Sequence, residues 1–338
     1  MKIENTVTRL LQIEYPLFMA PMFLVSNENM IKAAIHSGIM GVFPTLNFRE
    51  KGELEQVLNR IKAYKNQHPE EKGNYGVNLI VQQTSTKFEE HLKICVKQKV
   101  PFYITSLGKP DKVIEEAHSY GGKVFCDVTN IEHAEKCAKL GCDGFIAVGQ
   151  GAGGHAGPYP LHILIPALKN HFPEIPIIAA GGIATGSSIL SMLCLGAEGA
   201  SLGTRFIAST EASVNDEYKK AIVNYGMKDI VLSSRLSGTP SSVIRTKDAE
   251  KLGYFKTGFL ENLFNKNKTT KKYYRMLLQL KSMKIMKEST EKGAYKKIWS
   301  AGQSVELIDS ISNIDDIVKK LTHDMEESYE VLKKALHP

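Results

Sequence analysis

One histidine lies inside a glycine-rich segment, and this combination favours a ligand-binding loop. The segment Gly149–Pro158 reads GQGAGGHAGP, with five glycines and His155 as its one imidazole. Glycine lets the backbone approach a ligand closely or adopt positive φ, so Gly151, Gly153 and Gly154 suit a phosphate or the flat ring of a cofactor. A histidine, with an ordinary pKa of about 6.5, can transfer a proton at neutral pH or donate a hydrogen bond to a developing anion. The alternative is a glycine-rich turn whose histidine caps a helix.

Two further segments carry glycines just before an expected helix. Ala179–Gly186 reads AAGGIATG, and Ser201–Phe206 reads SLGTRF. Such positions present free backbone N–H groups and the positive end of a helix dipole, which together favour an anion. Each segment alone could be only a tight turn, but their joint occurrence predicts a phosphate grip. Its candidate residues are Gly181, Gly182, Gly203 and Thr204.

Three isolated side chains are weaker candidates for the same ligand. Met22 could lie against an aromatic ring system or fill the core. Asn78 is a polar residue in an apolar strand, where an amide either binds a ligand or satisfies the backbone. Lys123 could give a cation to a phosphate or an electron-rich ring, or it could be a solvated strand start. Cys126 and Asp127 are interpreted as structural.

Several classes of protein are excluded by the same survey. The sequence holds no H-x-x-x-H, G-x-S-x-G or Walker A pattern, and its five cysteines include no C-x-x-C pair, so no metal site, serine hydrolase or nucleotide triphosphatase is predicted. A net charge of +7 suits an anionic cofactor but falls short of a nucleic-acid footprint. The apolar runs are shorter than the roughly 20 residues that span a bilayer. Unpaired thiols and an acidic start without an apolar leader lead us to expect a cytoplasmic protein without membrane or nucleic-acid partners.

The elements that must position these residues alternate regularly. Hydrophobic residues make up 43% of the 338, enough for a sizeable core. The expected strands are Leu17–Ala20, Met40–Phe43, Tyr75–Ile80, Phe102–Thr105, Lys123–Val128, Gly144–Val148, Ile177–Ala180 and Gly199–Gly203. The expected helices are Asn29–Ser37, Lys51–Lys65, Phe88–Lys97, Asp111–Ser119, Ile131–Leu140, Leu161–Asn170, Ser187–Leu195 and Glu211–Asn224. Eight strands that are each followed by a helix predict a closed α/β fold, the (β/α)8 TIM barrel, whose active site lies in the loops after the strands.

The alternation ends near Tyr225. Residues 225–300 read as Ser/Thr/Gly-rich coil and then as a lysine-rich helical stretch, which predicts an inserted, mainly helical lid region. Residues 301–338 are expected to return to the barrel and to end in a closing C-terminal helix near Ile314–Leu336. The chain is thus divided into a barrel (1–224), an insert (225–300) and a C-terminal segment (301–338).

With these motifs in place, the chain resembles the nitronate monooxygenase family, formerly called 2-nitropropane dioxygenases. The resemblance rests on Gly149–Pro158, AGGI at 180–183, LGTRF at 202–206 and WSAGQ at 299–303, supported by MAPM at 19–22, GVNL at 76–79 and SGTP at 237–240. It implies an FMN-dependent TIM barrel with the phosphate at the glycines named above. It further implies that the ring lies near Met22, Asn78, Lys123 and the His155 loop, and that Gln303 adds a contact.

The resemblance also implies the chemistry. His155 matches the family's active-site histidine, which removes a proton from a nitroalkane or orients the nitronate, and FMN and O2 then convert the alkyl nitronate to a carbonyl compound and nitrite. A related alternative is a reductase that passes hydride from NAD(P)H to an enoyl-acyl-carrier-protein thioester or a quinone. Such reductases tend to carry an acidic residue shortly before Gly-Gly-His, where this chain has Gln150 and Ala152.

Two features keep other interpretations open. The insert holds many lysines between residues 266 and 297, which could meet an acidic carrier protein or the phosphate of a nicotinamide cofactor, or could be a solvated helix face. A non-catalytic flavin-binding sensor would keep the phosphate grip and lose turnover. The intact His155 favours an enzyme that acts on a small-molecule substrate.

Overall fold

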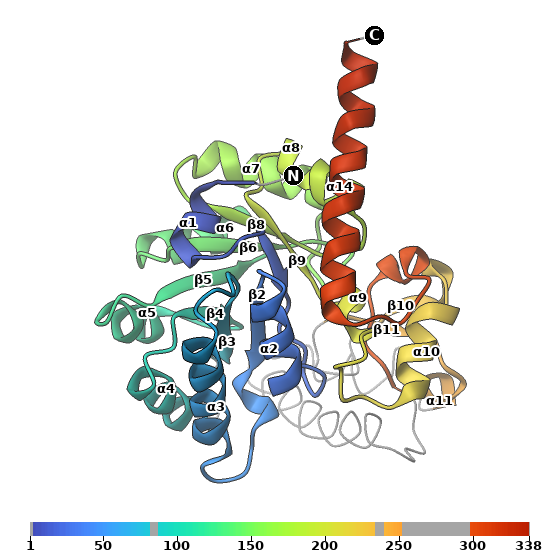
Figure 1. Cartoon of the computed structure of the whole chain (residues 1–338). Coiled ribbons are helices and arrows are strands. Elements are labelled where there is room, and N and C mark those ends of the chain that lie inside the picture. The colour runs from blue at the N-terminus through green and yellow to red at the C-terminus, as the bar shows by residue number, and fades with distance from the viewer. Residues whose placement is uncertain (1–2, 82–86, 234–239, 252–297, 338) are drawn as a thin grey trace, which may run out of the picture.

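The computed structural model describes residues 3–81, 87–233, 240–251 and 298–337. Its centre is a closed barrel of eight parallel strands in the order β1-β2-β3-β4-β5-β6-β8-β9 (Figure 1). The strands are β1 Leu17–Met19, β2 Met40–Pro44, β3 Asn74–Ile80, β4 Phe102–Ser106, β5 Lys123–Val128, β6 Gly144–Val148, β8 Ile177–Ala180 and β9 Gly199–Leu202. The predicted TIM barrel is confirmed.

Amphipathic helices cover the outside of the barrel. They are α2 Glu28–His36, α3 Glu53–Gln67, α4 Phe88–Lys97, α5 Asp111–His118, α6 Ile131–Lys139, α7 Leu161–His171, α8 Gly186–Cys194 and α10 Asp216–Asn224. The helix expected from Glu211 starts five residues later, because Asn215 caps α10 by accepting a hydrogen bond from Tyr218 N (2.8 Å). The short α9, Thr204–Ile207, precedes it.

The barrel interior is filled by side chains and closed at its amino end. Phe18, Phe102 and Phe125 pack edge to face or tilted, with ring centroids 5.7 and 5.2 Å apart. A helix that the sequence analysis did not anticipate, α1 Thr6–Leu11, adds Val7 to the same cluster. Apolar side chains therefore seal the end of the barrel that lies opposite the loops that follow the strands.

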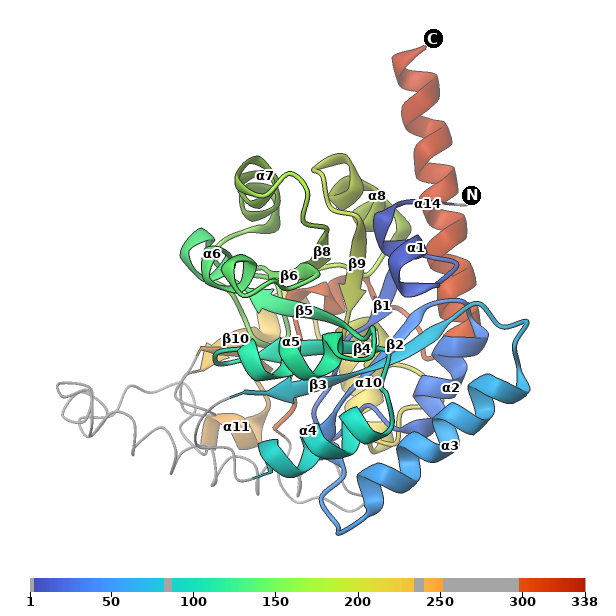
Figure 2. The same ribbon diagram turned by 90° about the vertical axis from the view of Figure 1, so that its left-hand side faces the viewer.

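The first part of the insert forms strands rather than the expected coil. Strand β10, Ile230–Ser233, pairs antiparallel with β11, Ser241–Ile244, and β11 pairs with the two-residue strand β7, Gly154–His155. Figures 1 and 2 show this small sheet at the end of the barrel opposite α1. The helix α11, Lys247–Lys251, follows, and the lysine-rich stretch lies outside the described residues.

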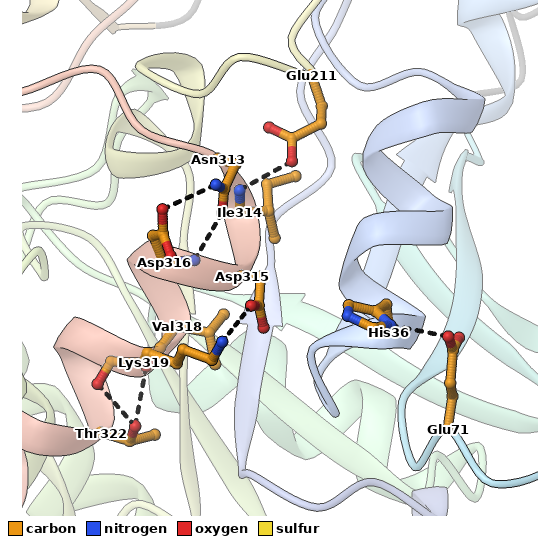
Figure 3. Close-up of polar contacts among 10 residues, drawn as sticks. All are labelled: His36, Glu71, Glu211, Asn313, Ile314, Asp315, Asp316, Val318, Lys319 and Thr322. Atoms are coloured by element: carbon orange, nitrogen blue, oxygen red, sulfur yellow. Dashed lines mark hydrogen bonds and ion pairs between the residues drawn. The ribbon is translucent and has the colours of Figure 1, made fainter.

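The closing helix α14, Ile314–Leu336, has the predicted bounds and packs on α8 and α2. Asn313 caps it by accepting from Asp316 N (2.8 Å), and Glu211 accepts from Ile314 N (2.9 Å), as Figure 3 shows. Its last turns project beyond the barrel (Figures 1 and 2). In the parts of the chain that the structure describes, no helix is both long and apolar enough to cross a membrane.

Candidate functional site

The glycine-rich loop leaves the carboxyl end of β6 and folds back on itself. Gly149 N donates to Ala180 O on β8 (2.8 Å), and Gly157 N donates to Gly149 O (3.2 Å). A β-carbon on Gly157 would overlap the carbonyl oxygen of Val148. The loop is therefore pinned to the top of the barrel at both of its ends, and only glycine fits its closing position.

Within this loop, glycines contact the loop after β8 backbone to backbone. A β-carbon at Gly151 would lie 2.9 Å from Gly182 Cα, and one at Gly181 would lie 2.8 Å from Ala152 N. Gly181 and Gly182 also adopt positive φ, +120° and +78°, which favours glycine. The structure thus brings together two segments that the sequence analysis singled out separately.

The tail segment enters the same place from the far end of the chain. Gly302 N donates to Thr204 Oγ1 (3.0 Å), and a β-carbon at Gly302 would lie 2.5 Å from Gly151 O. Trp299 stacks on Tyr218, with ring centroids 5.3 Å apart and an interplanar angle of 6°. The Tyr218 hydroxyl donates to Ser300 O (2.6 Å). This packing fixes the tail between the glycine-rich loop and α9.

His155 lies on β7 at the mouth of the barrel. Its backbone pairs with Ser241 of β11, and Ala156 N donates to Pro240 O (3.4 Å). The side chain is exposed, and yet desolvation by the surrounding protein lowers the pKa of the imidazole below its usual value. A neutral imidazole at neutral pH can accept a proton. The insert therefore positions the candidate base, a link that the sequence alone did not reveal.

A cavity of about 260 Å³ opens beside these loops. Gln303 contributes to its wall together with Gln150 and Ser188. Three of the glycines predicted to bind a cofactor, Gly151, Gly181 and Gly182, line it as well. Gln303, 121 positions beyond Gly182, thus shares a cavity with the residues predicted to hold the same ligand.

The donors on the loops after β8 and β9 fit a phosphate. Within the described residues, the backbone N–H groups of Gly182 and Ile183 donate to no protein acceptor. Thr204 accepts a hydrogen bond from Gly302, which leaves its own hydroxyl proton available. Gly203 has open space, because a β-carbon there would meet its nearest neighbours, in Ala20 and Met22, only at 3.8–3.9 Å. Met22 thus lies beside the predicted phosphate grip.

Asn78 lies inside the barrel mouth and takes part in a polar chain. Its Nδ2 donates to Ile104 O (3.1 Å) and to Ser106 Oγ (2.7 Å), and Ser106 Oγ donates to Asp127 Oδ2 (2.5 Å). Burial raises the pKa of Asp127 to about 6, although the Ser106 hydrogen bond opposes the shift. Ser106 was not among the residues predicted from the sequence, and Asp127 was interpreted as structural. The alternation of inward residues along β5 was the signal that could have found it.

The structure corrects the expected place of Lys123. This residue is the first of β5, and its Nζ makes an ion pair with Asp143 (3.2 Å) at the amino end of the barrel. The loops that follow the strands lie at the other end. Lys123 is therefore not among the residues that surround the candidate site.

Comparison with known proteins agrees with this geometry. A family model described as nitronate monooxygenase matches residues 43–324. The chain is 28% identical over 272 residues to (3aS,4S,5R,7aS)-5-hydroxy-7a-methyl-1-oxo-octahydro-1H-indene-4-carboxyl-CoA dehydrogenase of Mycobacterium tuberculosis, covering 79% of this chain and 74% of that protein. It is 26% identical over 301 residues to a probable nitronate monooxygenase of Staphylococcus aureus, covering 75% of this chain and 81% of that protein.

Solved structures extend the likeness to the whole chain. The structure of FabK from Thermotoga maritima superposes with a TM-score of 0.84 at 28% identity, covering 98% of this chain and 99% of that one. Nitroalkane oxidase from Streptomyces ansochromogenes gives a TM-score of 0.76 at 20% identity, covering 97% and 100%. The second likeness shows the fold alone.

Proposed function

The chain belongs to the nitronate monooxygenase family of oxidoreductases, and from this premise we propose that it is an FMN-dependent enzyme that oxidises alkyl nitronates with O2 to a carbonyl compound and nitrite. The observation that carries the proposal is the position of His155. It stands at the barrel mouth, on a strand that β11 holds in place, beside the loops that suit a cofactor. The substrate would be a small molecule.

The residues on three loops fit FMN. The phosphate would be held by the N–H groups of Gly182 and Ile183 and by the Thr204 hydroxyl, with Gly203 leaving space for its approach and the positive φ of Gly181 forming the turn. The ring would be bounded by Met22, Asn78, Gly151, Gly153 and Gly154, with Gln303 at the side of the cavity. Bound FMN supplies the redox chemistry by which electrons reach O2.

The protein's own contribution is proton handling and positioning. With a pKa lowered by desolvation, His155 is neutral at pH 7 and can remove the proton on the carbon that bears the nitro group. Once protonated, the imidazolium sits beside the nitronate that it has formed and can hold this anion by a hydrogen bond. A substrate supplied as the nitronate needs the second role only.

A second candidate function is favoured by the likeness to FabK over almost the whole chain. In that case the protein would be an NAD(P)H-dependent flavin reductase of enoyl thioesters or quinones. The relative named as a carboxyl-CoA dehydrogenase also points to thioester substrates. Gln150 and Ala152 stand where an acidic residue is expected in such reductases, which supports the monooxygenase instead.

An anaerobic titration of the FMN-loaded protein distinguishes the two. NADH, NADPH and an alkyl nitronate are added in parallel while the oxidised-flavin absorbance is followed. Bleaching by the nitronate alone, with recovery of the band in air, supports the monooxygenase. Bleaching by NADH or NADPH but not by the nitronate contradicts it and supports the reductase.

A further inference from the structure

Three polar side chains form a hydrogen-bonded chain across neighbouring strands inside the barrel. Asn78, Ser106 and Asp127 belong to β3, β4 and β5. Each lies in the carboxyl-terminal half of its strand, so the chain stands at the end of the barrel where the proposed cofactor binds. Asn78 is buried, whereas Ser106 and Asp127 are partly accessible, so the chain opens toward the mouth at Asp127.

The strand register shows that Asp127 points inward. Asp127 pairs in register with Ile146 of β6, and Phe125, two residues earlier, pairs with Ile104 of β4. Ile104, Phe125 and Ile146 all belong to the hydrophobic cluster that fills the barrel. Because alternate residues of a strand share a face, Asp127 stands directly above Phe125 in the interior.

The side-chain N–H and O–H donors of Asn78 and Ser106 are all engaged in hydrogen bonds within the barrel. Both donor bonds of Asn78 Nδ2 are made within the barrel, to Ile104 O and Ser106 Oγ, and the single proton of Ser106 goes to Asp127 Oδ2. Within the described residues, no donor reaches Asn78 Oδ1 or Asp127 Oδ1. Asn78 Oδ1 and Asp127 Oδ1 therefore remain available as hydrogen-bond acceptors for a ligand at the mouth of the barrel.

No cation compensates the carboxyl of Asp127 in the described part of the chain. Its neighbours are the neutral Ser106 and Thr105 on β4 and the apolar Ile146 and Ala147 on β6. Lys123 of the same strand is engaged with Asp143 at the other end of the barrel. Desolvation raises the pKa of Asp127 to about 6, so at neutral pH this carboxyl is mostly ionised and has little solvent to stabilise it.

We infer that Asp127, held by Ser106 and Asn78, contacts the bound flavin and tunes its reduction potential. This rests on the proposed function, because it requires FMN at the barrel mouth. A carboxylate there would accept a hydrogen bond from an N–H of the oxidised ring and would repel the negative charge that reduction adds. It therefore stabilises oxidised over reduced flavin.

The proton balance of reduction follows from the same placement. Two electrons convert oxidised flavin to its singly anionic reduced form with uptake of one proton by the ring. A negative charge on the ring would raise the pKa of Asp127, so that reduction would draw part of a second proton from solvent onto this carboxylate. Near this pKa, reduction would thereby be coupled to a fraction of a proton more than the flavin itself needs.

The test measures the midpoint potential of FMN bound to the full chain, by equilibration with a reference dye. In Asp127→Asn we expect reduced FMN to gain about 10-fold in affinity relative to oxidised FMN, which raises the potential by about 30 mV for a two-electron couple. Between pH 5 and pH 8 the wild-type potential should fall by about 30 mV more in total than that of the variant, because this extra fall equals the 10-fold effect of the charge. Asp143→Asn, which removes a carboxylate at the other end of the barrel, should leave the potential unchanged.

Ser106→Ala gives an independent test if Asp127→Asn does not fold. Loss of the Ser106 donor raises the pKa of Asp127 further, so the potential at pH 7 should rise toward the value expected for Asp127→Asn. An unchanged or lower potential in these variants overturns the inference and leaves the proposed function standing. A wild-type protein that binds no FMN at all instead overturns the proposed function.

Discussion

The backbone N–H of Gly302 donates a hydrogen bond to the side-chain hydroxyl of Thr204, 3.0 Å away and 98 residues earlier in the chain. This bond ties the C-terminal segment to the loop after β9. It also sets the direction of the Thr204 hydroxyl, whose oxygen accepts from Gly302 and whose proton remains to be donated. A residue predicted to hold a phosphate is thus oriented by a segment far away in the sequence.

Replacement of Thr204 by valine should weaken FMN binding. The valine side chain keeps the shape but removes both the acceptor for Gly302 and the donor to the phosphate. A hydrogen bond to a charged group contributes about 1.5–3 kcal/mol, so we expect a 10- to 100-fold loss of FMN affinity, measured by fluorescence titration of the apoprotein. Thr204→Ser keeps the hydroxyl and should bind nearly as wild type. Equal affinity in Thr204→Val would remove Thr204 from the phosphate site.

Gly302→Ala should destabilise the apoprotein. Its β-carbon would lie 2.5 Å from Gly151 O, a backbone atom that cannot turn aside, so the tail or the glycine-rich loop must shift. Overpacking of this kind costs about 1–3 kcal/mol, measured as a change in the free energy of unfolding in urea. Gly203→Ala is the matched control, because Gly203 has a similar φ, −102° against −90°, and its β-carbon would meet nothing closer than 3.8 Å. A similar loss in both variants would mean that the close approach of Gly302 does not matter.

The barrel could be predicted because each strand and each helix carries its own pattern. The expected Phe88–Lys97 and Ile314–Leu336 have the bounds of α4 and α14, since local periodicity marks both helices and Asn313 caps the start of α14. The strands β10 and β11 were missed for the opposite reason. Their pairing depends on β7, a strand of two residues in a glycine-rich loop, which has no periodicity of its own.

The glycines of the candidate site could be predicted from the sequence. The end of the barrel at which a strand residue lies, and the side to which it points, could not. Gly151 and Gly181 are required because backbone contact permits no side chain, and Gly182 because its φ is +78°. Lys123 was misplaced because the first residue of a parallel strand lies at the end away from the active-site loops. Asp127, four residues later on the same strand, lies at the right end and points inward. Both placements follow from strand polarity and alternation, which residue type alone does not convey.

Removal of His155 should separate its two proposed roles. His155→Ala should lower kcat/KM for a neutral nitroalkane by roughly 10²- to 10⁴-fold, the usual contribution of a general base, and much less for the preformed nitronate. His171→Ala, which removes a surface imidazole at the end of α7, should change neither. Equal losses on both substrates would exclude the base role.

The pH profile gives a second view of His155. Its pKa is lowered, so the neutral form that accepts a proton persists to lower pH than for an ordinary histidine. We expect the rate with nitroalkane to fall only below the ordinary value of about 6.5 and to be level above it. A limb of the profile centred above pH 7 would show that another group is the base.

The charge of Asp127 should be visible in the stability of the apoprotein. Its folded-state pKa of about 6 lies above the ordinary value of 3.8, so the native state binds the proton more tightly than the unfolded state does. The stability that this preference gives is present below the unfolded pKa and is lost as the pH rises through 6. Asp127→Asn stays neutral at every pH. The free energy of unfolding of the variant, relative to that of wild type, should therefore rise by roughly 1–2 kcal/mol between pH 4 and pH 7 and then stay constant.

Asp309→Asn should change the stability with pH in the opposite direction to Asp127→Asn. Ser310 donates a hydrogen bond to Asp309 and, with Lys320 nearby, holds the pKa of this carboxyl below its usual value. Its contribution is present above the unfolded pKa and is lost as the pH falls, so the asparagine variant should lose stability relative to wild type as the pH rises. The effect should be small, because the carboxyl is exposed. Urea unfolding at pH 3, 4, 5, 6, 7 and 8 measures both differences, because the Asp309 effect changes only below about pH 5. A constant difference between Asp127→Asn and wild type would show that Asp127 titrates alike in the folded and unfolded chain, and the carboxylate would then be well solvated at the barrel mouth.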